Sequence, residues 1–257
     1  MRSMHSPAAG RTSHRLPVVL SLLAALVLGA FAAAPASAGA ATFTPLIHIN
    51  ACDRAAKCAG GNATGNLTAI LRGRKPELLT LNEVCSATVN QVAKRTGYKK
   101  VFAQAGRAMC PGGRGKYGNA IMAAPQRDLV KTVEAKYSMQ QAGAEKRVLL
   151  CADSTGAAVC TTHLDHRGKA VAQAGELRTA LAAQLARNAN LFFGADLNLA
   201  PPAARQHALP AGMRRIGDGR VMHIFYAAAF GQLGGVLLKN TLTWTDHAGL
   251  ALRAPTA

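Results

Sequence analysis

Helices and strands alternate along this chain, and several of the predicted strands are joined by tight hairpins. Residues 170–187 are the clearest predicted helix, because apolar side chains recur there at helical spacing. Residues 148–151 and 157–163 are predicted strands on either side of a turn at Thr155-Gly156. Such hairpins do not fit a purely parallel, doubly wound sheet. The pattern therefore predicts an α/β protein in which two mixed β-sheets pack together with helices outside.

The other predicted elements are mostly short. Strands are predicted at residues 42–50, 77–82, 98–102, 119–123, 129–137, 191–193, 220–227, 241–245 and 249–252. Helices are predicted at residues 62–72 and 87–95, ended by Pro76 and Gly97 respectively. Residues 107–118 form a basic, glycine-rich loop.

The first 38 residues are predicted to be a signal peptide that is removed. Three arginines and no acidic residue precede an apolar run at residues 16–31, and Ala36-Ser37-Ala38 follows it. The run is short for a membrane anchor, which is the alternative. We therefore expect a single domain at residues 39–257. It should be secreted and extracellular, with no stable insertion in a membrane.

The charge of the mature chain is strongly positive. Three of the 30 Lys and Arg residues precede Ala38, so 27 remain against 12 Asp and Glu residues, a net charge of +15. Such an excess favours polyanionic partners such as nucleic acid. A generally basic, soluble protein is the alternative interpretation, because charge alone identifies no site.

Six cysteines, all beyond the leader, are typical of an oxidising compartment. The predicted disulfides are Cys52–Cys58, Cys85–Cys110 and Cys151–Cys160. In the third pair, the two-residue turn places the cysteines opposite each other at a separation that a disulfide accepts. The first pair closes a small loop, and the second takes the two remaining cysteines. Zinc binding is the alternative use, although no C-x-x-C motif occurs.

Four polar segments follow apolar strands, where a sheet exposes side chains at its rim. They are Leu81-Asn82-Glu83, TTHLD at 161–165, GADLN at 194–198 and Thr245-Asp246-His247. Taken singly, each is a common turn or helix cap. Together they supply carboxylates for a hard divalent cation, histidines for proton transfer and asparagines for phosphoryl oxygens. Asp196 and Asn198 are two residues apart, so an extended chain would point both side chains the same way.

In this order, the segments resemble the endonuclease/exonuclease/phosphatase superfamily, which includes deoxyribonuclease I-like enzymes. The matching pieces are Asn50, LNEV at 81–84, YGNAIM at 117–122, TTHLD, GADLN and TDHAGL at 245–250. The resemblance covers residues 43–252. It implies a four-layered α/β sandwich, with two mixed β-sheets packed face to face and helices outside, and a metal-dependent hydrolase of phosphate esters.

The resemblance also implies roles for individual residues. His163 and His247 would flank the scissile phosphate as acid and base, Asp196 would orient the attacking water, and Asn198 would hold the phosphate or the nucleophile. The implied metal ligands are Glu83, Asn50 and Asp246. The implied phosphate contacts are Asn119, Arg114 and Lys116. Mg²⁺ is the expected ion, with Mn²⁺ or Ca²⁺ as alternatives.

Two positions depart from the family pattern. Met222 stands where an Asp is expected to hold the reactive histidine, and Asp218 is a candidate substitute from the adjacent turn. A Glu partner for His163 is expected before YGNAIM, but no Glu occurs between Glu83 and Glu134. Because of these departures, the two histidines lack carboxylate partners for proton transfer that the family pattern provides.

Several other histidines and the single tryptophan can be explained without a metal site or a ligand site. His163 and His166 have the H-x-x-H spacing of some zinc sites, yet on a strand end they would point in different directions. His48 alternates with apolar neighbours and is predicted to be a core histidine. Trp244 is also expected in the core.

The sequence thus predicts a secreted, metal-dependent phosphodiesterase. We expect a monomeric nuclease that hydrolyses DNA, with RNA as a second substrate, by in-line attack of water. One alternative is a lipid phosphodiesterase of the same fold, similar to sphingomyelinases or phosphoinositide phosphatases. The other is a catalytically silent, secreted polyanion-binding protein, for which Met222 is the main support.

Overall fold

The computed structural model describes residues 46–54, 58, 62–238 and 244–253. They belong to one compact unit, Thr42–Ala257. Among the described residues, we find no helix with the length and apolar character that a membrane span requires. The predicted signal peptide lies outside the described residues, as do residues 42–45 of the first predicted strand.

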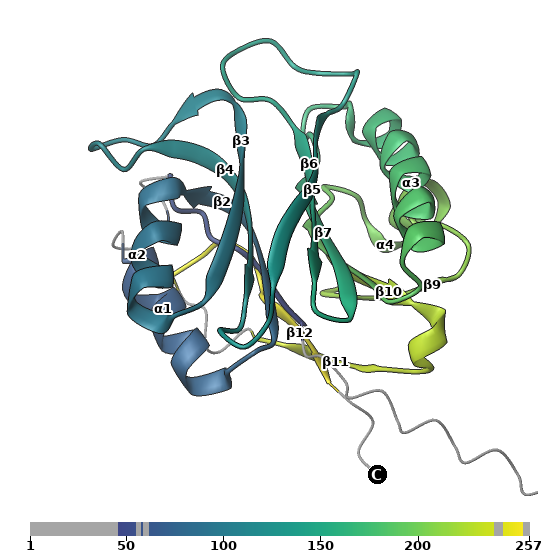
Figure 1. Cartoon of the computed structure of the whole chain (residues 1–257). Coiled ribbons are helices and arrows are strands. Elements are labelled where there is room, and N and C mark those ends of the chain that lie inside the picture. Colours follow the sequence, from purple (N-terminus) through teal and green to yellow (C-terminus); the bar gives the residue numbers. More distant parts are fainter. Residues whose placement is uncertain (1–45, 55–57, 59–61, 239–243, 254–257) are drawn as a thin grey trace, which may run out of the picture. The chain divides into compact units, whose positions relative to one another are not determined.

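The first sheet has six strands in the order β11-β12-β1-β2-β4-β3 (Figure 1). Their bounds are β1 Leu46–Asn50, β2 Leu78–Cys85, β3 Lys99–Met109, β4 Lys116–Ala123, β11 Gly234–Leu237 and β12 Leu250–Arg253. β1 and β2 run parallel, with Asn50 opposite Asn82. The other neighbours in this sheet are antiparallel.

The second sheet also has six strands, in the order β5-β6-β7-β8-β10-β9. Their bounds are β5 Leu129–Lys136, β6 Val148–Ser154, β7 Ala157–His163, β8 Leu191–Asp196, β9 Met213–Gly217 and β10 Met222–Ala227. Here β7 and β8 are the parallel pair, with His163 opposite Asp196. The other neighbours are antiparallel.

Helices cover the outer face of each sheet (Figure 1). The helices are α1 Ala63–Arg74, α2 Ser86–Thr96, α3 Ala170–Arg187 and α4 Pro201–Ala203, with a π-helical turn at Ala204–Ala208 and a 3-10 turn at Ala228–Phe230. One apolar cluster lies between the first sheet and α1 and α2, a second between the second sheet and α3, and a third between the two sheets. The chain is therefore the predicted four-layered sandwich of two mixed sheets.

Side-chain alternation along β1 explains why polar residues reach the space between the sheets. Ile47 and Ile49 pack toward the helices, while Leu46 packs between the sheets. Since successive side chains of a strand point to opposite faces, His48 and Asn50 share the inward face with Leu46. Both are buried.

A glycine on β8 lets the two sheets approach closely below this polar end. A Cβ atom on Gly194 would lie 2.4 Å from the Thr80 hydroxyl oxygen and 2.8 Å from His48 Cβ. Contacts this short exclude any larger residue without a shift of the strands. His48 is thus the core histidine that the sequence predicts, with its Nδ1 3.0 Å from the Thr80 hydroxyl.

The three disulfides join the predicted pairs, Cys52–Cys58, Cys85–Cys110 and Cys151–Cys160. Cys151 and Cys160 are directly opposite in the β6–β7 ladder, with their Cα atoms 4.1 Å apart. This agrees with the separation expected from the two-residue turn.

Several predicted elements need correction. β3 extends to Met109, well beyond the expected end at residue 102, because its pairing with β4 resumes after a register shift. The predicted strand at 241–245 falls partly outside the described residues, and Trp244 and Thr245 lie in a turn. β9 and β11 were not predicted, since both are short and only partly buried. Trp244 packs in the core as expected.

Candidate active site

The four polar segments meet at one end of the sandwich, where both parallel strand pairs terminate. They border a cleft of about 480 Å³. Its lining residues are Arg54, Glu83, Tyr117, Glu145, Arg147, His163, His166, Asp196, Asn198, Asp246 and His247. The lining contains six of the ten predicted catalytic, metal-binding and phosphate-binding residues.

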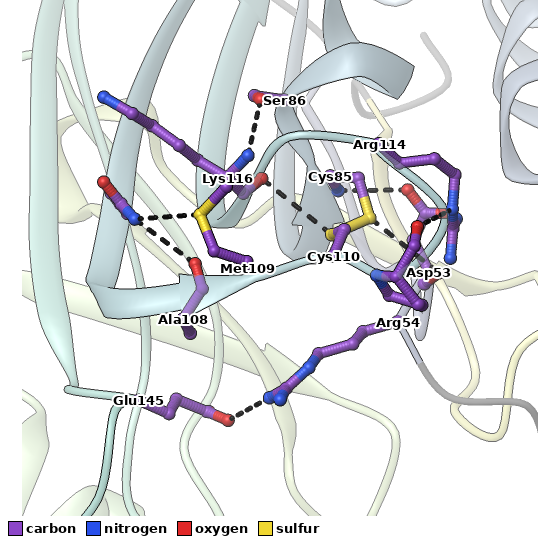
Figure 2. The surroundings of a disulfide bond; sticks show 12 residues. Asp53, Arg54, Cys85, Ser86, Ala108, Met109, Cys110, Arg114, Lys116 and Glu145 are labelled. Carbon is purple, nitrogen blue, oxygen red and sulfur yellow. Dashed lines mark hydrogen bonds and ion pairs between the residues drawn. A yellow bond between two sulfur atoms is a disulfide. The ribbon is translucent and has the colours of Figure 1, made fainter.

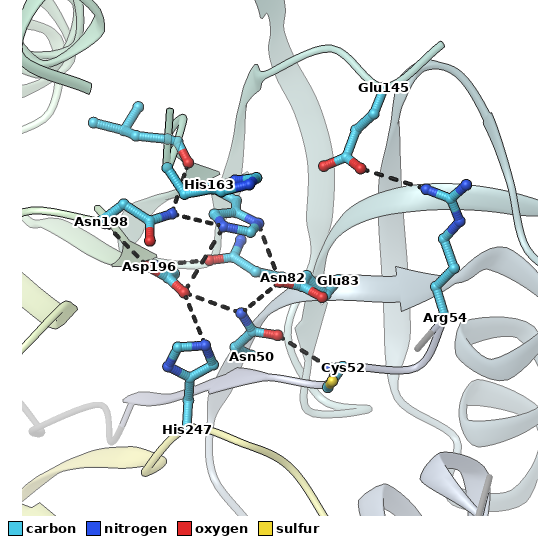
Figure 3. A network of polar contacts seen from close by, with 12 residues as sticks. Asn50, Cys52, Arg54, Asn82, Glu83, Glu145, His163, Asp196, Asn198 and His247 are labelled. Carbon is cyan, nitrogen blue, oxygen red and sulfur yellow. Dashed lines mark hydrogen bonds and ion pairs between the residues drawn. The ribbon is translucent and has the colours of Figure 1, made fainter. Parts of the chain in front are cut away.

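Asn50 joins the two sheets at the base of the cleft (Figure 3). Its amide nitrogen donates to Glu83 Oε1 and to Asp196 Oδ2, each at 3.1 Å. Its amide oxygen accepts from the Cys52 backbone N–H at 3.0 Å. Asn50 therefore holds carboxylates of different sheets together. Its predicted role as a metal ligand stays a prediction, because the amide nitrogen faces the carboxylates.

Glu83 reaches the cleft through an irregularity of β2. The pairing of β2 with β4 shifts register between Leu81 and Val84. Glu83 itself has a φ of 53°, in the left-handed region that residues other than glycine rarely adopt. Backbone strain of this kind persists where surrounding contacts impose it, and it is common at functional sites. Because of this shift, the Glu83 carboxylate faces the cleft, where its side chain is 20% exposed.

Asn82 is a supporting residue whose role the sequence analysis missed. It is fully buried, and its amide oxygen accepts from the Asp196 backbone N–H at 2.8 Å. Its amide nitrogen donates to Asn119 Oδ1 at 3.0 Å and to Thr161 Oγ1 at 3.1 Å. Asn119 in turn donates to the Val148 carbonyl. Asn119 is thus engaged with protein atoms and is not part of the cleft lining, although it borders a small neighbouring pocket with Glu83 and His163, and its expected role as a phosphate contact stays a prediction.

Asn198 and His163 form a coupled pair on the second sheet. The Asn198 side-chain nitrogen lies 3.0 Å from His163 Nε2 and also donates to the Leu164 carbonyl. The Asn198 backbone N–H donates to Asp196 Oδ1. Asn198 has a φ of 48°, so a turn, and not the expected extended chain, brings it beside Asp196.

His247 completes the site from the C-terminal segment. Its Nε2 lies 3.5 Å from Asp196 Oδ2 and 3.5 Å from Asp246 Oδ1. The Thr245 hydroxyl donates to the Asn50 carbonyl at 2.7 Å, which fixes this segment against the end of β1. His247 therefore lies within ion-pairing distance of two carboxylates.

Burial sets the protonation of two site residues. It lowers the pKa of His163 well below its ordinary value, and the nearby Arg147 and His247 lower it further. His163 is therefore neutral near pH 7, which suits its contact with an amide N–H at Nε2. Burial raises the pKa of Asp196, and the Glu83 charge adds to this, whereas His247 and the N–H donors of Asn198 and Asn50 oppose it.

The two departures from the family pattern have different outcomes. Met222 is buried between the sheets opposite Asp196 and supplies no polar group. Asp218 accepts from the backbone N–H groups of Arg220 and Met222, so its carboxylate stabilises the β9–β10 turn. Glu83 Oε1 lies 3.6 Å from His163 Nδ1 and Asp196 Oδ2 lies 3.8 Å from His163 Nε2, so carboxylates from β2 and β8 lie near this histidine.

The predicted phosphate contacts from the basic loop lie apart from the cleft lining. Arg114 pairs with the buried Asp53 beside the Cys85–Cys110 disulfide (Figure 2). Lys116 is exposed at the start of β4. The cations of the cleft are instead Arg54 and Arg147, which no local sequence signal distinguishes from the many other basic residues. Contact of Arg114 or Lys116 with a longer polyanion stays a prediction.

The oxygen donors of the cleft are of the type that a hard divalent cation prefers. Glu83, Asp196 and Asp246 place carboxylates around one cleft, and such a cation binds through carboxylates, water and substrate phosphate. A zinc site on His163 and His166 is not supported, because His166 lies between Arg147 and Arg167. In the described part of the chain, a three-residue group with metal-binding spacing comprises Cys52, Cys58 and Asp246, but the two thiols form a disulfide.

The sequence matches no family model and no curated relative. Among solved structures, the chain is similar to several proteins, and three of them are the following. The first is D. rerio TDP2 complexed with a single-strand DNA product, with 16% identity and a TM-score of 0.57 over 81% of this chain and 97% of that chain. The second is the human Nocturnin catalytic domain with a bound sulfate anion, with 17% identity and a TM-score of 0.60 over 81% of this chain and 91% of that chain. The third is an endonuclease/exonuclease/phosphatase family protein from Bacteroides thetaiotaomicron, with 12% identity and a TM-score of 0.58 over 81% of this chain and 93% of that chain. The chain therefore shares the fold of these proteins, the deoxyribonuclease I-like fold that the resemblance predicted.

Proposed function

We propose that this chain is a secreted, divalent-metal-dependent phosphodiesterase that cleaves nucleic acid. One observation supports this most directly: Glu83, His163, Asp196, Asn198 and His247, from four separate segments, line a single cleft. The fold adds support, since one structure that shares it is a TDP2 complexed with a single-strand DNA product.

Glu83 and Asp246 would hold the metal, with Asn50 fixing the position of Glu83. When bound, Mg²⁺ supplies charge neutralisation at the phosphate, and Mn²⁺ or Ca²⁺ are alternatives. The carboxylate oxygens are the ligand type that these ions prefer.

The remaining residues divide the work on the water and the phosphate. Asp196 would orient the attacking water and accept its proton, because burial has raised its pKa and made it a stronger base. His247, at 3.5 Å from Asp196, would pass a proton toward the leaving oxygen. Asn198 would hold a phosphoryl oxygen with its amide nitrogen. Neutral His163 would orient Asn198 through the contact at Nε2.

A nucleic acid is favoured over a small phosphomonoester by charge. The predicted mature chain carries +15, and Arg54 and Arg147 line the cleft itself. The three disulfides and the leader support secretion into an oxidising compartment. Exposed large apolar side chains, which a lipid-cleaving enzyme would use to contact a membrane, are scattered over different elements of the described chain.

A catalytically silent polyanion-binding protein is the second candidate. Met222 favours it, because its thioether cannot stabilise a charged imidazole and Asp218 is committed to a turn. In that case the cleft would bind polyanions without turning them over.

The test is a plasmid-nicking assay on the purified protein with its disulfides intact. Supercoiled plasmid and single-stranded RNA are incubated in Mg²⁺ and in EDTA, with Asp196→Ala and the control Asp153→Ala in parallel. Asp153 is a half-exposed partner of Arg187, far from the cleft lining. We expect metal-dependent cleavage by the wild type and the control, and none by Asp196→Ala. Binding without cleavage in any metal would favour the silent protein instead.

A further inference from the structure

The cleft has two chemically distinct walls. One carries the carboxylates and histidines of the proposed reaction. The other carries two arginines and a single carboxylate, Arg54, Arg147 and Glu145, which the reaction does not use. Figure 3 shows Arg54 and Glu145 together on the far side of Glu83 from Asn198 and His247.

Glu145 holds the two arginines with one oxygen each. Its Oε2 lies 3.4 Å from an Arg54 nitrogen, and its Oε1 lies 2.9 Å from an Arg147 nitrogen. Arg147 is additionally placed by His166, 3.2 Å away, and its side chain is only 10% exposed. The carboxylate therefore sits where an anion from solvent would meet both guanidinium groups.

The two halves of this bridge differ in strength. The Arg54 side chain is 43% exposed and that of Glu145 is 29% exposed. An ion pair so open to water contributes little to stability, so an incoming anion can replace it at low cost. Phosphate offers oxygens to two guanidinium groups with better geometry and more charge than a carboxylate does.

Backbone contacts fix the position of Glu145. The Arg107 N–H donates to the Ala144 carbonyl and the Lys146 N–H donates to the Ala105 carbonyl, so the segment around Glu145 pairs with the end of β3 across the two sheets. Gly106 permits this approach, because a Cβ there would lie 2.5 Å from the Ala144 oxygen. The carboxylate is thus presented to the cleft by a tethered backbone.

The arginine wall lies within electrostatic range of the reaction centre. The charge of Arg147 contributes to lowering the pKa of His163. Tyr117, whose phenol pKa is raised by burial and then by Glu83 and Glu145, lies between the two walls. The Arg54 guanidinium stands over the Tyr117 ring, 5.3 Å from its centroid.

We propose that Arg54 and Arg147 form a second phosphate subsite, and that Glu145 occupies it in the free protein as an exchangeable counter-ion. Arg54 is then the specificity-determining residue for a substrate with a phosphate next to the scissile one. This rests on the proposed function. It narrows the substrate class to molecules with at least two neighbouring phosphates, supplied by a nucleic-acid strand or by a diphosphate linkage.

The test compares substrates that differ by one phosphate. Cleavage is measured for the dinucleotide dTpdT, for the same dinucleotide with a 5′- or a 3′-phosphate, and for a diphosphate-linked dinucleoside. The variants are Arg54→Ala, Arg54→Lys and Glu145→Gln. Arg187→Ala is the matched control, because Arg187 is also 43% exposed and paired with a carboxylate, Asp153.

We expect the wild type to prefer a doubly phosphorylated dinucleotide. Arg54→Ala should reduce that preference, as a ratio of kcat/KM values, by about 10-fold, and Arg54→Lys should restore part of it. Glu145→Gln should lower the KM for the doubly phosphorylated substrate. Arg187→Ala should keep the wild-type ratio. The substrate whose cleavage depends most strongly on Arg54 identifies the source of the second phosphate, a nucleic-acid strand or a diphosphate linkage.

Equilibrium binding in EDTA separates this proposal from the proposed function. If no substrate is cleaved in any metal, the proposed function fails. The subsite still stands if the extra phosphate tightens binding and Arg54→Ala removes that gain. If cleavage is metal-dependent but the phosphate preference is the same in Arg54→Ala as in the wild type, the subsite is overturned and the nuclease remains.

Discussion

Each sheet contains one parallel strand pair, and the two pairs deliver site residues by different physical means. In the first sheet, β1 ends at Asn50 and β2 carries Glu83 two residues before its end, and β7 and β8 of the second sheet end at His163 and Asp196. The first end is braced covalently. Cys52 and Cys85 follow Asn50 and Glu83 by two residues, and both are in disulfides.

Asp53 links the two disulfides of the first end. Its carboxylate accepts from the Cys85 backbone N–H at 3.0 Å and pairs with Arg114 (Figure 2). The segments after β1 and β2 are therefore joined to each other by hydrogen bonds of Asp53 around a strained Glu83, and each segment carries its own disulfide. The disulfides restrict the backbone on either side of Glu83, whose carboxylate is partly exposed to solvent.

The second end is held by neutral amides. Asn82 accepts from the Asp196 N–H, and Asn198 contacts His163. At this end, burial lowers the pKa of His163 and raises that of Asp196. Under the proposed function, the first end would hold the metal ion in place, whereas the second would set the proton affinities of the reacting groups.

The largest effects should separate these two roles. We expect Glu83→Gln and Asp196→Asn each to lower kcat/KM by about 10²–10⁴-fold at low Mg²⁺, because each removes a reactive carboxylate. Raising Mg²⁺ should recover part of the activity of Glu83→Gln but none for Asp196→Asn. A titration of rate against Mg²⁺ measures this, with Glu77→Gln, at the other end of β2, as control. Equal recovery of activity by Mg²⁺ in both variants would contradict the assignment of metal binding to Glu83 and proton transfer to Asp196.

Disulfide removal should affect the two sheets differently. The double variant Cys85→Ala/Cys110→Ala should lose about 2–4 kcal/mol of unfolding free energy and need more Mg²⁺ for half-maximal rate. The matched variant Cys151→Ala/Cys160→Ala should lose stability too, yet keep the Mg²⁺ requirement, because that disulfide faces α3. Denaturant unfolding and metal titration check both. An unchanged Mg²⁺ requirement in the first variant would show that the brace is not needed at Glu83.

The smallest expected effect concerns pH. Burial lowers the pKa of His48, on the first sheet, to about 3 and that of His223, on the second, to about 4. His223 is held neutral on both sides, donating from Nε2 to the Leu199 carbonyl and accepting at Nδ1 from Arg215. Between the ordinary pKa of 6.5 and these values, the unfolded chain binds more protons than the folded one.

Stability should therefore fall as pH drops below about 6.5, by at most about 2 kcal/mol per histidine at about pH 5. The raised pKa of Asp196 acts in the opposite sense at lower pH, because there the folded chain binds more protons. His223→Gln should reduce the difference in Tm between about pH 7.5 and about pH 5. An identical difference in this variant and the wild type would show that His223 is not neutral in the fold.

Much of the fold and the centre of the site could be predicted because they depend on local patterns. Helical spacing predicted α3 at residues 170–187, its observed bounds. The two-residue hairpin turn fixed the register that places Cys151 opposite Cys160. The polar ends of apolar strands gave Glu83, His163 and Asp196, since strand termini lie at the sheet rim.

Residues whose roles depend on contacts with other parts of the chain could not be recognised from a local sequence pattern. Asn82 is one of many polar residues in the sequence, and its role depends on Asp196, 114 positions away. Asn198 was expected to continue an extended strand, but an Asx-type contact with Asp196 turns the chain. Arg114 looked like a free cation because its partner Asp53 lies 61 residues earlier.

The sequence by itself determined the alternation of helices and strands, the Cys151–Cys160 pair and which segments carry the polar groups of the cleft. These follow from side-chain periodicity, turn length and residue chemistry over a few neighbouring positions. Only the tertiary structure decided which cations enter the cleft, which amides support the carboxylates and how Glu145 meets Arg54. Those contacts arise where two sheets approach at Gly194 and where a tethered loop pairs with β3. Distances between such segments depend on the packing of whole layers, which no local pattern encodes.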